Sequence, residues 1–139
     1  MKTSDEGVKK LEVREGKRNK AYKDVKGVWT IGVGHTGPHV CEGLVWTNQQ
    51  VKDALRDDLV TAEDAINKYV IVPLTQNQFD ALVSFVFNVG VLAFRRSTLL
   101  KLLNTGAYDL AAEAFDMWHI PPEIIGRRDS ERDQFNGLA

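Results

Sequence analysis

The chain has 139 residues and a mass of 15.6 kDa, which is enough for one domain with a buried core. Hydrophobic residues make up 43% of it and charged residues 27%, a globular composition that excludes a disordered chain or a collagen-like repeat, while the single cysteine, Cys41, excludes an internal disulfide. The net charge of −1 combines a basic balance of +4 over residues 1–30 with an acidic balance of −5 over the rest. The N-terminal part therefore either attracts an anionic polymer, such as a cell-wall glycan or nucleic acid, or is an ordinary solvated face.

The first predicted helix runs from the N-cap residue Ser4 to Glu15, where Gly16 ends it. Val8, Leu11 and Glu15 are spaced so that they share one face of this helix. A carboxyl group is therefore expected on the inward stripe, where desolvation and the negative end of the helix dipole both disfavour its charged form. A carboxyl group that keeps its proton can act as a general acid.

A β-hairpin is predicted next, with its turn over residues 24–27. From residue 29 to residue 35, apolar residues alternate with Thr30, Gly32 and Gly34, which is the period of a strand. The two glycines remove side chains from the face that carries the threonine. We therefore expect a bulky polymer to be able to lie against that face.

Asp24 lies in the turn close to Lys23 and Lys26, which should keep it ionised. An acid such as Glu15 and an ionised carboxylate are the pair that glycoside hydrolysis requires. The hydroxyl group of Thr30 can hold a water molecule beside Asp24. The residues alone leave a second interpretation open, in which all three have purely structural roles.

A connection over residues 36–46 leads to a long helix that ends near Tyr69. Thr47 and Gln50 form a capping box at its start. At about 1.5 Å per residue this helix is roughly 30–35 Å long, enough to join a small lobe to a larger one. Its apolar residues recur mostly at steps of three and four: Val51, Leu55, Leu59, Ala62, Ile66 and Tyr69.

The C-terminal half is predicted to be helical. Thr75 and Gln78 repeat the capping-box pattern and open a helix, ending at Gly90, that is apolar nearly all round, as a central buried helix is. An interruption is expected at Pro121 and Pro122. The further predicted helices cover residues 97–104, 108–118 and 122–135.

The predicted fold class is therefore α+β, within a single domain over residues 1–139. A small β-containing lobe is expected over residues 12–70 and a larger helical lobe over residues 1–11 and 71–139. The long helix is expected to join the two lobes.

The residues around the hairpin resemble the active-site signature of the phage-type lysozymes, the endolysins of the T4-like and lambdoid family, glycoside hydrolase family 24. The resemblance includes Glu15, then Asp24 nine residues later and Thr30 six residues after that, which are the spacings of the family's catalytic triad. Two further stretches resemble the family's central helix and its C-terminal block, over residues 81–106 and 118–135. Together the three motifs cover nearly the whole chain.

The resemblance implies a lysozyme-like fold and hydrolysis of the β-1,4 bond between N-acetylmuramic acid and N-acetylglucosamine in peptidoglycan. It assigns Glu15 as the general acid. Asp24 and Thr30 either position the attacking water, which favours direct displacement with inversion, or Asp24 stabilises the oxocarbenium-like state. A covalent route through Asp24 stays open.

Lower-ranked substrate-binding candidates are His35, Phe87 and Asn88. For His35 a supporting hydrogen bond or ion pair is the main expectation, for Phe87 core packing is the alternative, and for Asn88 a hydrogen bond at the helix end. Arg127 and Arg128 either reach an anionic group of the wall or form helix ion pairs with Asp129, Glu131 or Asp133. Trp29, Trp46 and Trp118 either stack on sugars or pack in the core.

No cofactor and no metal is expected, because no His and Cys cluster has metal-ligand spacing. The expected partner is the glycan strand of peptidoglycan, without nucleic acid, without stable membrane insertion and as a monomer. The N-terminus has no apolar signal region, so we expect accumulation in the host cytoplasm and release through a holin. The remaining alternatives are a lytic transglycosylase, a catalytically silent wall-binding module and a helical DNA-binding domain.

Overall fold

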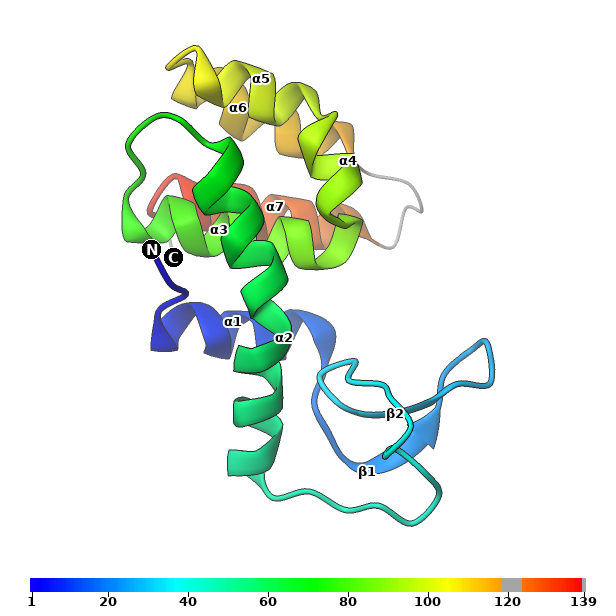
Figure 1. Ribbon diagram of the computed structural model, residues 1–139. Helices are drawn as coiled ribbons and strands as arrows, with labels where there is room; N and C mark the ends of the chain where they lie inside the picture. Colours follow the sequence, from blue (N-terminus) through cyan, green and yellow to red (C-terminus); the bar gives the residue numbers. More distant parts are fainter. Residues whose placement is uncertain (119–123, 139) are drawn as a thin grey trace. The chain divides into compact units, whose positions relative to one another are not determined.

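The computed structural model describes residues 1–118 and 124–138 and confirms the α+β class (Figure 1). A single two-stranded antiparallel sheet is present in the described residues, and the other regular elements are helical. The strands are β1 (Arg18–Lys23) and β2 (Trp29–Gly32). The helices are α1 (Asp5–Glu15), α2 (Asn48–Tyr69), α3 (Gln76–Val89), α4 (Val91–Arg95), α5 (Thr98–Asn104), α6 (Tyr108–Ala114), a 3₁₀ turn η1 (Phe115–Met117) and α7 (Ile125–Phe135).

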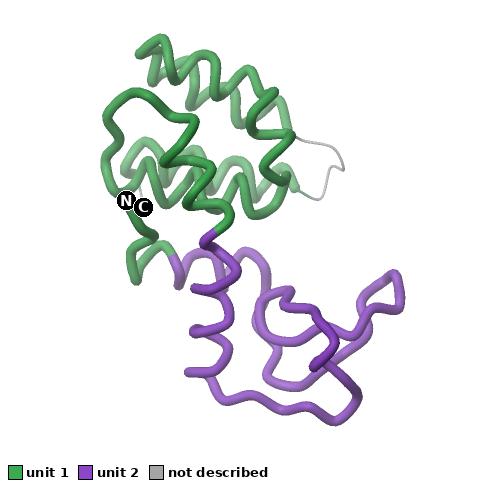
Figure 2. The backbone as a smooth tube through the Cα atoms, viewed as in Figure 1, with its two compact units in different colours: residues 1–7, 61–139 green, residues 8–60 purple. Residues whose placement is uncertain are grey.

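The chain forms two compact units, which are coloured separately in Figure 2. Unit 1 contains residues 1–7 and 61–139, and unit 2 contains residues 8–60. Helices α1 and α2 each contribute residues to both units. Among the helices of the described ranges, none is both long and apolar enough to cross a membrane.

Unit 2 is built around the hairpin of β1 and β2. Tyr22 pairs with Thr30 and Lys23 pairs with Trp29, and the register shifts between Arg18 and Tyr22, as a β-bulge does. Beneath the hairpin lies a small apolar cluster, on which two tryptophans pack. Its buried members are Ala21, Ile31 and Val40, and its half-buried members are Trp29, Leu44 and Trp46.

The predicted strand over residues 29–35 is too long, because the chain turns back after Gly32. Gly32 and Gly34 adopt φ values of +67° and +70°, which suit glycine and end an extended strand. Ile31 and His35 then exchange two backbone hydrogen bonds of 2.9 Å across the turn. The bare glycine face expected beside Thr30 is present in part: a β-carbon added to Gly32 would lie 3.4 Å from the ring of Trp46, whereas nothing lies within 4 Å of one added to Gly34.

The capping patterns predicted the starts of the two longest helices correctly. Thr47 and Gln50 exchange hydrogen bonds of 2.8 and 3.1 Å at the start of α2, and Thr75 and Gln78 exchange bonds of 2.9 and 3.1 Å at the start of α3. Each box satisfies two N–H groups that the helix itself leaves without a partner. Of the apolar residues predicted for the inward face of α2, Tyr69 is half-buried and the others are buried: Val51, Leu55, Leu59, Ala62 and Ile66.

The shorter helices differ from the prediction in detail. The five-residue helix α4 had no sequence signal of its own, and the helix predicted over residues 108–118 ends at Ala114 and continues as η1. The last helix, predicted over residues 122–135, is α7 over Ile125–Phe135 in the described residues. Pro121 and Pro122, where an interruption was expected, lie outside the described residues.

Unit 1 is centred on α3, which is buried from Phe79 to Val86, as its apolar composition predicted. Phe85 meets Phe115 edge to face at 5.4 Å, and Phe115 lies 5.6 Å from Phe135 of α7. The N-terminal residues are tied to this core, because Thr3 donates two hydrogen bonds of 2.7 Å to Glu63. These contacts join segments that are far apart in the sequence.

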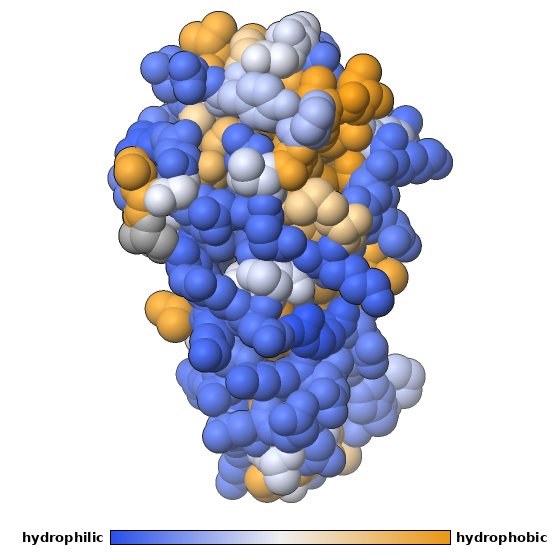
Figure 3. Space-filling model, turned by 90° about the vertical axis from the view of Figure 1, so that its left-hand side faces the viewer, coloured by the Kyte–Doolittle hydropathy of each residue, from blue (hydrophilic) through white to orange (hydrophobic). Residues whose placement is uncertain are grey.

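The surface is mainly polar, and its exposed apolar side chains are distributed over both units. On the face shown in Figure 3, hydrophilic side chains cover most of the lower part of the view and apolar side chains gather toward the top. Isolated exposed apolar side chains are normal for a globular protein. The most exposed are Val13, Val25 and Val45 in unit 2, and Ile71, Met117 and Leu138 in unit 1.

Gly7 provides a test of the packing in unit 1. A β-carbon added there would lie 2.6 Å from the Asp80 carboxyl carbon and 2.9 Å from Thr3, and Asp80 is held by hydrogen bonds from Ser4. We expect Gly7→Ala to lower the free energy of unfolding by about 1–3 kcal/mol in urea denaturation.

Gly126, in the first turn of α7, is the matched control because nothing lies within 4 Å of its added β-carbon. Gly126→Ala should be neutral or stabilise by less than about 1 kcal/mol. Equal unfolding free energies for the two variants would show that the side chains around Gly7 can shift at little cost in free energy.

Candidate active site

Asp24 is held in the hairpin turn by the backbone. Its Oδ1 atom accepts hydrogen bonds from the N–H groups of Lys26 at 2.8 Å and Val28 at 2.9 Å, an Asx-type turn, and Gly27 supports the turn with a φ of +79°. The backbone N–H of Asp24 donates to the Val28 carbonyl at 2.9 Å. The side chain is half-buried, and its Oδ2 atom takes no part in these bonds.

Thr30, like Asp24, is hydrogen-bonded to the backbone of Val28. It lies on β2 with 4% of its surface exposed, and its Oγ1 atom donates to the Val28 carbonyl at 2.9 Å. The backbone of Val28 therefore accepts from Thr30 and Asp24 through its carbonyl and donates to Asp24 through its N–H. These shared bonds to one residue hold the two side chains in a defined register.

Glu15 is the last residue of α1, and two residues separate it from the start of β1 at Arg18. Gly16 ends the helix with a φ of +78° and a backbone bond of 2.9 Å to Glu12. Val8 and Leu11 of the predicted stripe are fully buried, and Glu15 at its end is half-buried. The three residues of the predicted triad all belong to unit 2.

His35 makes the kind of supporting contact that its position suggested. Its Nδ1 atom lies 2.7 Å from Oδ2 of Asp58 on α2, and its Nε2 atom lies 2.8 Å from Nε2 of His39. In a bond between two imidazole nitrogens one must donate and the other accept. The contact with Asp58 ties the loop after the hairpin to the long helix.

His39, which was not singled out from the sequence, lies beside His35 and Trp46 in the structure. Its ring stacks at 18° to Trp46, and together with His35 the two rings form one wall of a shallow hollow of about 370 Å³. Its spacing of four from His35 was the only available signal. Residues of α2 also line the hollow, among them Gln50, Asp53 and Asp57.

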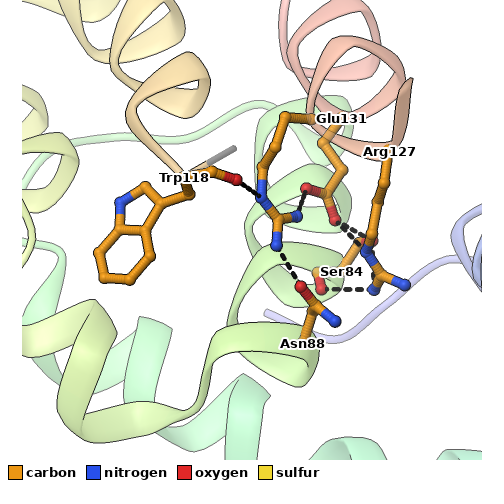
Figure 4. A network of polar contacts seen from close by, with 6 residues as sticks. Ser84, Asn88, Trp118, Arg127 and Glu131 are labelled. Carbon is orange, nitrogen blue, oxygen red and sulfur yellow. Dashed lines mark hydrogen bonds and ion pairs between the residues drawn. The ribbon is translucent and has the colours of Figure 1, made fainter. Parts of the chain in front are cut away.

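Phe87 and Asn88 lie near the end of α3 in unit 1. Phe87 is half-buried and Asn88 is exposed, with its Oδ1 atom bonded to Arg128. Arg128 and Arg127 both pair with Glu131, so the ion-pair alternative is the one that the structure contains (Figure 4).

The three tryptophans that the sequence offered as sugar-stacking candidates pack against apolar side chains. Trp29 and Trp46 pack on the apolar cluster of unit 2, and Trp118 meets Phe85 edge to face at 5.6 Å. Cys41 is an exposed free thiol. Within residues 1–118 and 124–138, no group of three or more His, Cys, Asp or Glu side chains is arranged to hold a metal ion.

Comparisons with known proteins give one consistent result. The family model described as phage lysozyme matches residues 12–131. The endolysin of Salmonella phage P22 is 44% identical over 143 residues, which covers 97% of this chain and 98% of that protein. The endolysin of Bacillus phage PZA is 43% identical over 98% of this chain, but this chain spans only 55% of that protein's length.

The fold gives the same result. The crystal structure of a P22 lysozyme mutant matches with a TM-score of 0.94 and 43% identity, covering 98% of this chain and 99% of that one.

The bond between His35 and Asp58 should stabilise unit 2. Asp58→Asn removes the charge from the contact, and because the two side chains are 18% and 32% exposed we expect a loss of only about 1 kcal/mol in the free energy of unfolding. Asp57→Asn changes the same charge one residue away, on an exposed side chain, and should cost less than about 0.5 kcal/mol. A thermal melt compares the two, and equal melting temperatures would contradict a stabilising role for the His35 contact.

Proposed function

The chain belongs to the phage lysozyme family and is an endolysin, and from this premise we propose that Glu15, Asp24 and Thr30 perform its chemistry. An endolysin of this family is a muramidase, a glycoside hydrolase that degrades peptidoglycan and so lyses the host cell. The bond cleaved is the β-1,4 bond between N-acetylmuramic acid and N-acetylglucosamine. The proposal concerns the role of each residue in that cleavage.

Glu15 is proposed as the general acid that protonates the leaving oxygen of the glycosidic bond. Its support is its place at the end of α1, half-buried and immediately before the hairpin that carries the other two residues. An acid in that position donates its proton as the bond breaks, and it can recover a proton from solvent before the next turnover.

Asp24 and Thr30 are proposed to hold the attacking water. The observation that carries this proposal is the backbone of Val28, whose N–H and carbonyl each bond one of the two side chains. Because the Thr30 hydroxyl already donates its single proton to Val28, it can only accept a hydrogen bond from water. A water that donates one hydrogen to Thr30 and the other to Asp24 keeps an oxygen lone pair for the anomeric carbon, and Asp24 takes the proton released.

This arrangement favours a single displacement with inversion of the anomeric centre. In the competing route Asp24 itself attacks the sugar, and water releases the glycosyl-enzyme in a second step with overall retention. The two routes give opposite anomers in the product formed first, which can be distinguished by NMR before mutarotation.

The chain is also proposed to act as a monomer on glycan strands, to accumulate in the host cytoplasm and to reach the wall through a holin. The support is the match with the P22 endolysin along nearly the full length of both proteins. Lysis that depends on co-expression of a holin would support this route, and lysis without one would contradict it.

The role of Glu15 gives the first prediction on activity. Glu15→Gln keeps the side-chain volume and removes the proton donor, so the rate of clearing of outer-membrane-permeabilised bacteria should fall by about 10²–10⁴-fold while the melting temperature stays near that of the wild type. Glu42→Gln, at an exposed position of unit 2, is the matched control and should clear at the wild-type rate. Equal clearing by the wild type and Glu15→Gln would remove Glu15 from the role of acid.

The role of Thr30 gives a second prediction on activity. Thr30→Ala removes the group that accepts from the water and should lower the rate roughly 10- to 100-fold, because a misplaced reactant is costly. Thr30→Ser keeps a hydroxyl group and should retain most of the activity. A Thr30→Ser variant as slow as Thr30→Ala would show that the packing of the methyl group, rather than the hydroxyl, is what matters.

A further inference from the structure

His35 and His39 meet through their ring nitrogens in the shallow hollow of unit 2. Their Nε2 atoms lie 2.8 Å apart. Both residues, and the other residues that line this hollow, belong to unit 2. The geometry of the hollow is therefore set within one compact part of the chain.

Asp58 determines which nitrogen of the His35 ring carries the proton. Its Oδ2 atom lies 2.7 Å from Nδ1 of His35, and because an ionised carboxylate can only accept, Nδ1 is the donor. In the neutral ring Nε2 then keeps its lone pair, and Nε2 is the atom that meets His39. Metal-binding histidines in proteins commonly have this arrangement, in which one ring nitrogen donates to a carboxylate and the other binds the ion.

The ring of His39 has two close neighbours, although the side chain is exposed. The Trp46 ring lies nearly parallel to it, with the ring planes at 18° and the centroids 6.4 Å apart. At Gly37, which has a φ of +144°, an added β-carbon would lie 2.8 Å from Cε1 and 3.1 Å from Nδ1 of the His39 ring. The ring therefore packs closely against the backbone of Gly37, and these contacts help to keep its Nε2 atom beside His35.

The hollow also collects negative charge. Asp53 and Asp57 of α2 line it together with the two histidines. Carboxylates around a hollow attract a cation, and they can bind it through a bridging water. In the part of the chain that the structure describes, no third His, Cys, Asp or Glu side chain joins the two histidines as a direct ligand. Water must therefore complete the coordination of an ion held there.

We propose that His35 and His39 form a binding site for a divalent transition-metal ion that favours imidazole, such as Ni²⁺, Cu²⁺ or Zn²⁺. The ion takes the lone pairs of both Nε2 atoms, and waters bonded to Asp53 and Asp57 fill its other positions. The proton that His39 donates in the metal-free state moves to its own Nδ1 atom, so both rings stay neutral. The proposal goes beyond the hydrolytic reaction and does not depend on it.

The separation of the two nitrogens favours some of these ions over others. Two nitrogens that bind a metal ion at about 2.0–2.1 Å are roughly 2.9 Å apart when they lie at right angles, and roughly 3.3 Å apart in a tetrahedral site. The observed 2.8 Å is closer to the first value. We therefore expect Cu²⁺ and Ni²⁺, which accept ligands at right angles, to bind more tightly than Zn²⁺.

The first test is a calorimetric titration of the full chain with NiCl₂, since Ni²⁺, unlike Cu²⁺, does not readily oxidise an exposed thiol such as Cys41. We expect one Ni²⁺ ion to bind per chain. His39→Gln leaves a single imidazole ligand and should weaken binding about tenfold or more. Absence of binding by the wild type, or equal affinities of the wild type and His39→Gln, would overturn the proposal. MgCl₂ should give no binding at the same concentrations, because Mg²⁺ prefers oxygen ligands.

Two variants control for other ligands. His119→Gln removes the same group from a distant position in the sequence, and Cys41→Ser removes the thiol two residues after His39. Both should bind Ni²⁺ with the wild-type affinity. Loss of binding in either control would move the ligands away from the pair of His35 and His39, and it would overturn the proposal.

Asp58→Asn tests whether Asp58 orients the His35 ring for the ion. The asparagine can still accept from Nδ1 but carries no charge, so the affinity for Ni²⁺ should fall about tenfold. Unchanged affinity in this variant would contradict the orientation of His35 on which the site depends. If His39→Gln does not fold, the result for Asp58→Asn decides.

Thermal melts give a second measurement that needs no substrate. At a free Ni²⁺ concentration of about ten times Kd, the melting temperature of the wild type should rise by roughly 3–6 °C, because the ion binds only the folded pair of rings. His39→Gln should show no such rise at the same concentration. Equal rises in both proteins would mean that Ni²⁺ acts at another place, and they would overturn the proposal.

Discussion

The backbone of Val28 is the point on which the placement of Asp24 and Thr30 depends. Its N–H donates to the Asp24 side chain, and its carbonyl oxygen accepts from the Asp24 backbone and the Thr30 hydroxyl. A side chain bonded to backbone is held by groups that cannot change rotamer, which is the rigidity that catalysis by orientation needs. The hairpin is therefore more than a spacer between helices, because its turn defines where an acceptor and a carboxylate stand.

Unit 1, by contrast, holds charged side chains inside an apolar core. Helix α3 is buried for eight consecutive residues, and the carboxylate of Glu131 is fully buried in the same unit. A buried carboxylate is tolerated only when cations and hydroxyl groups satisfy it, and here two arginines and Ser84 do so. The position of α7 is therefore constrained, because its side chains Arg127, Arg128 and Glu131 must all meet α3 in one geometry.

Much of the fold could be predicted from the sequence, where the signal is local. Capping boxes at Thr47 and Thr75 gave the starts of α2 and α3, and apolar periodicity gave the buried face of α2. The end of β2 could not be predicted, because alternation does not reveal that Gly32 and Gly34 adopt positive φ values. The short helix α4 has too few residues for periodicity to show.

For the candidate site too, contacts between residues close in the sequence could be predicted and contacts between distant residues could not. Glu15, Asp24 and Thr30 lie within one short stretch, so their spacing in the sequence already carries the pattern, and the family resemblance could be seen from it. Asn88 and Arg128 are 40 residues apart in sequence, and nothing local indicates that they meet. Asp24 and Thr30 are thus fixed by the backbone next to them, whereas Asn88 of α3 is held by a partner from α7. A contact with such a distant partner is lost when either helix shifts, so the orientation of Asn88 depends on the packing of unit 1, while that of Asp24 depends on its own turn.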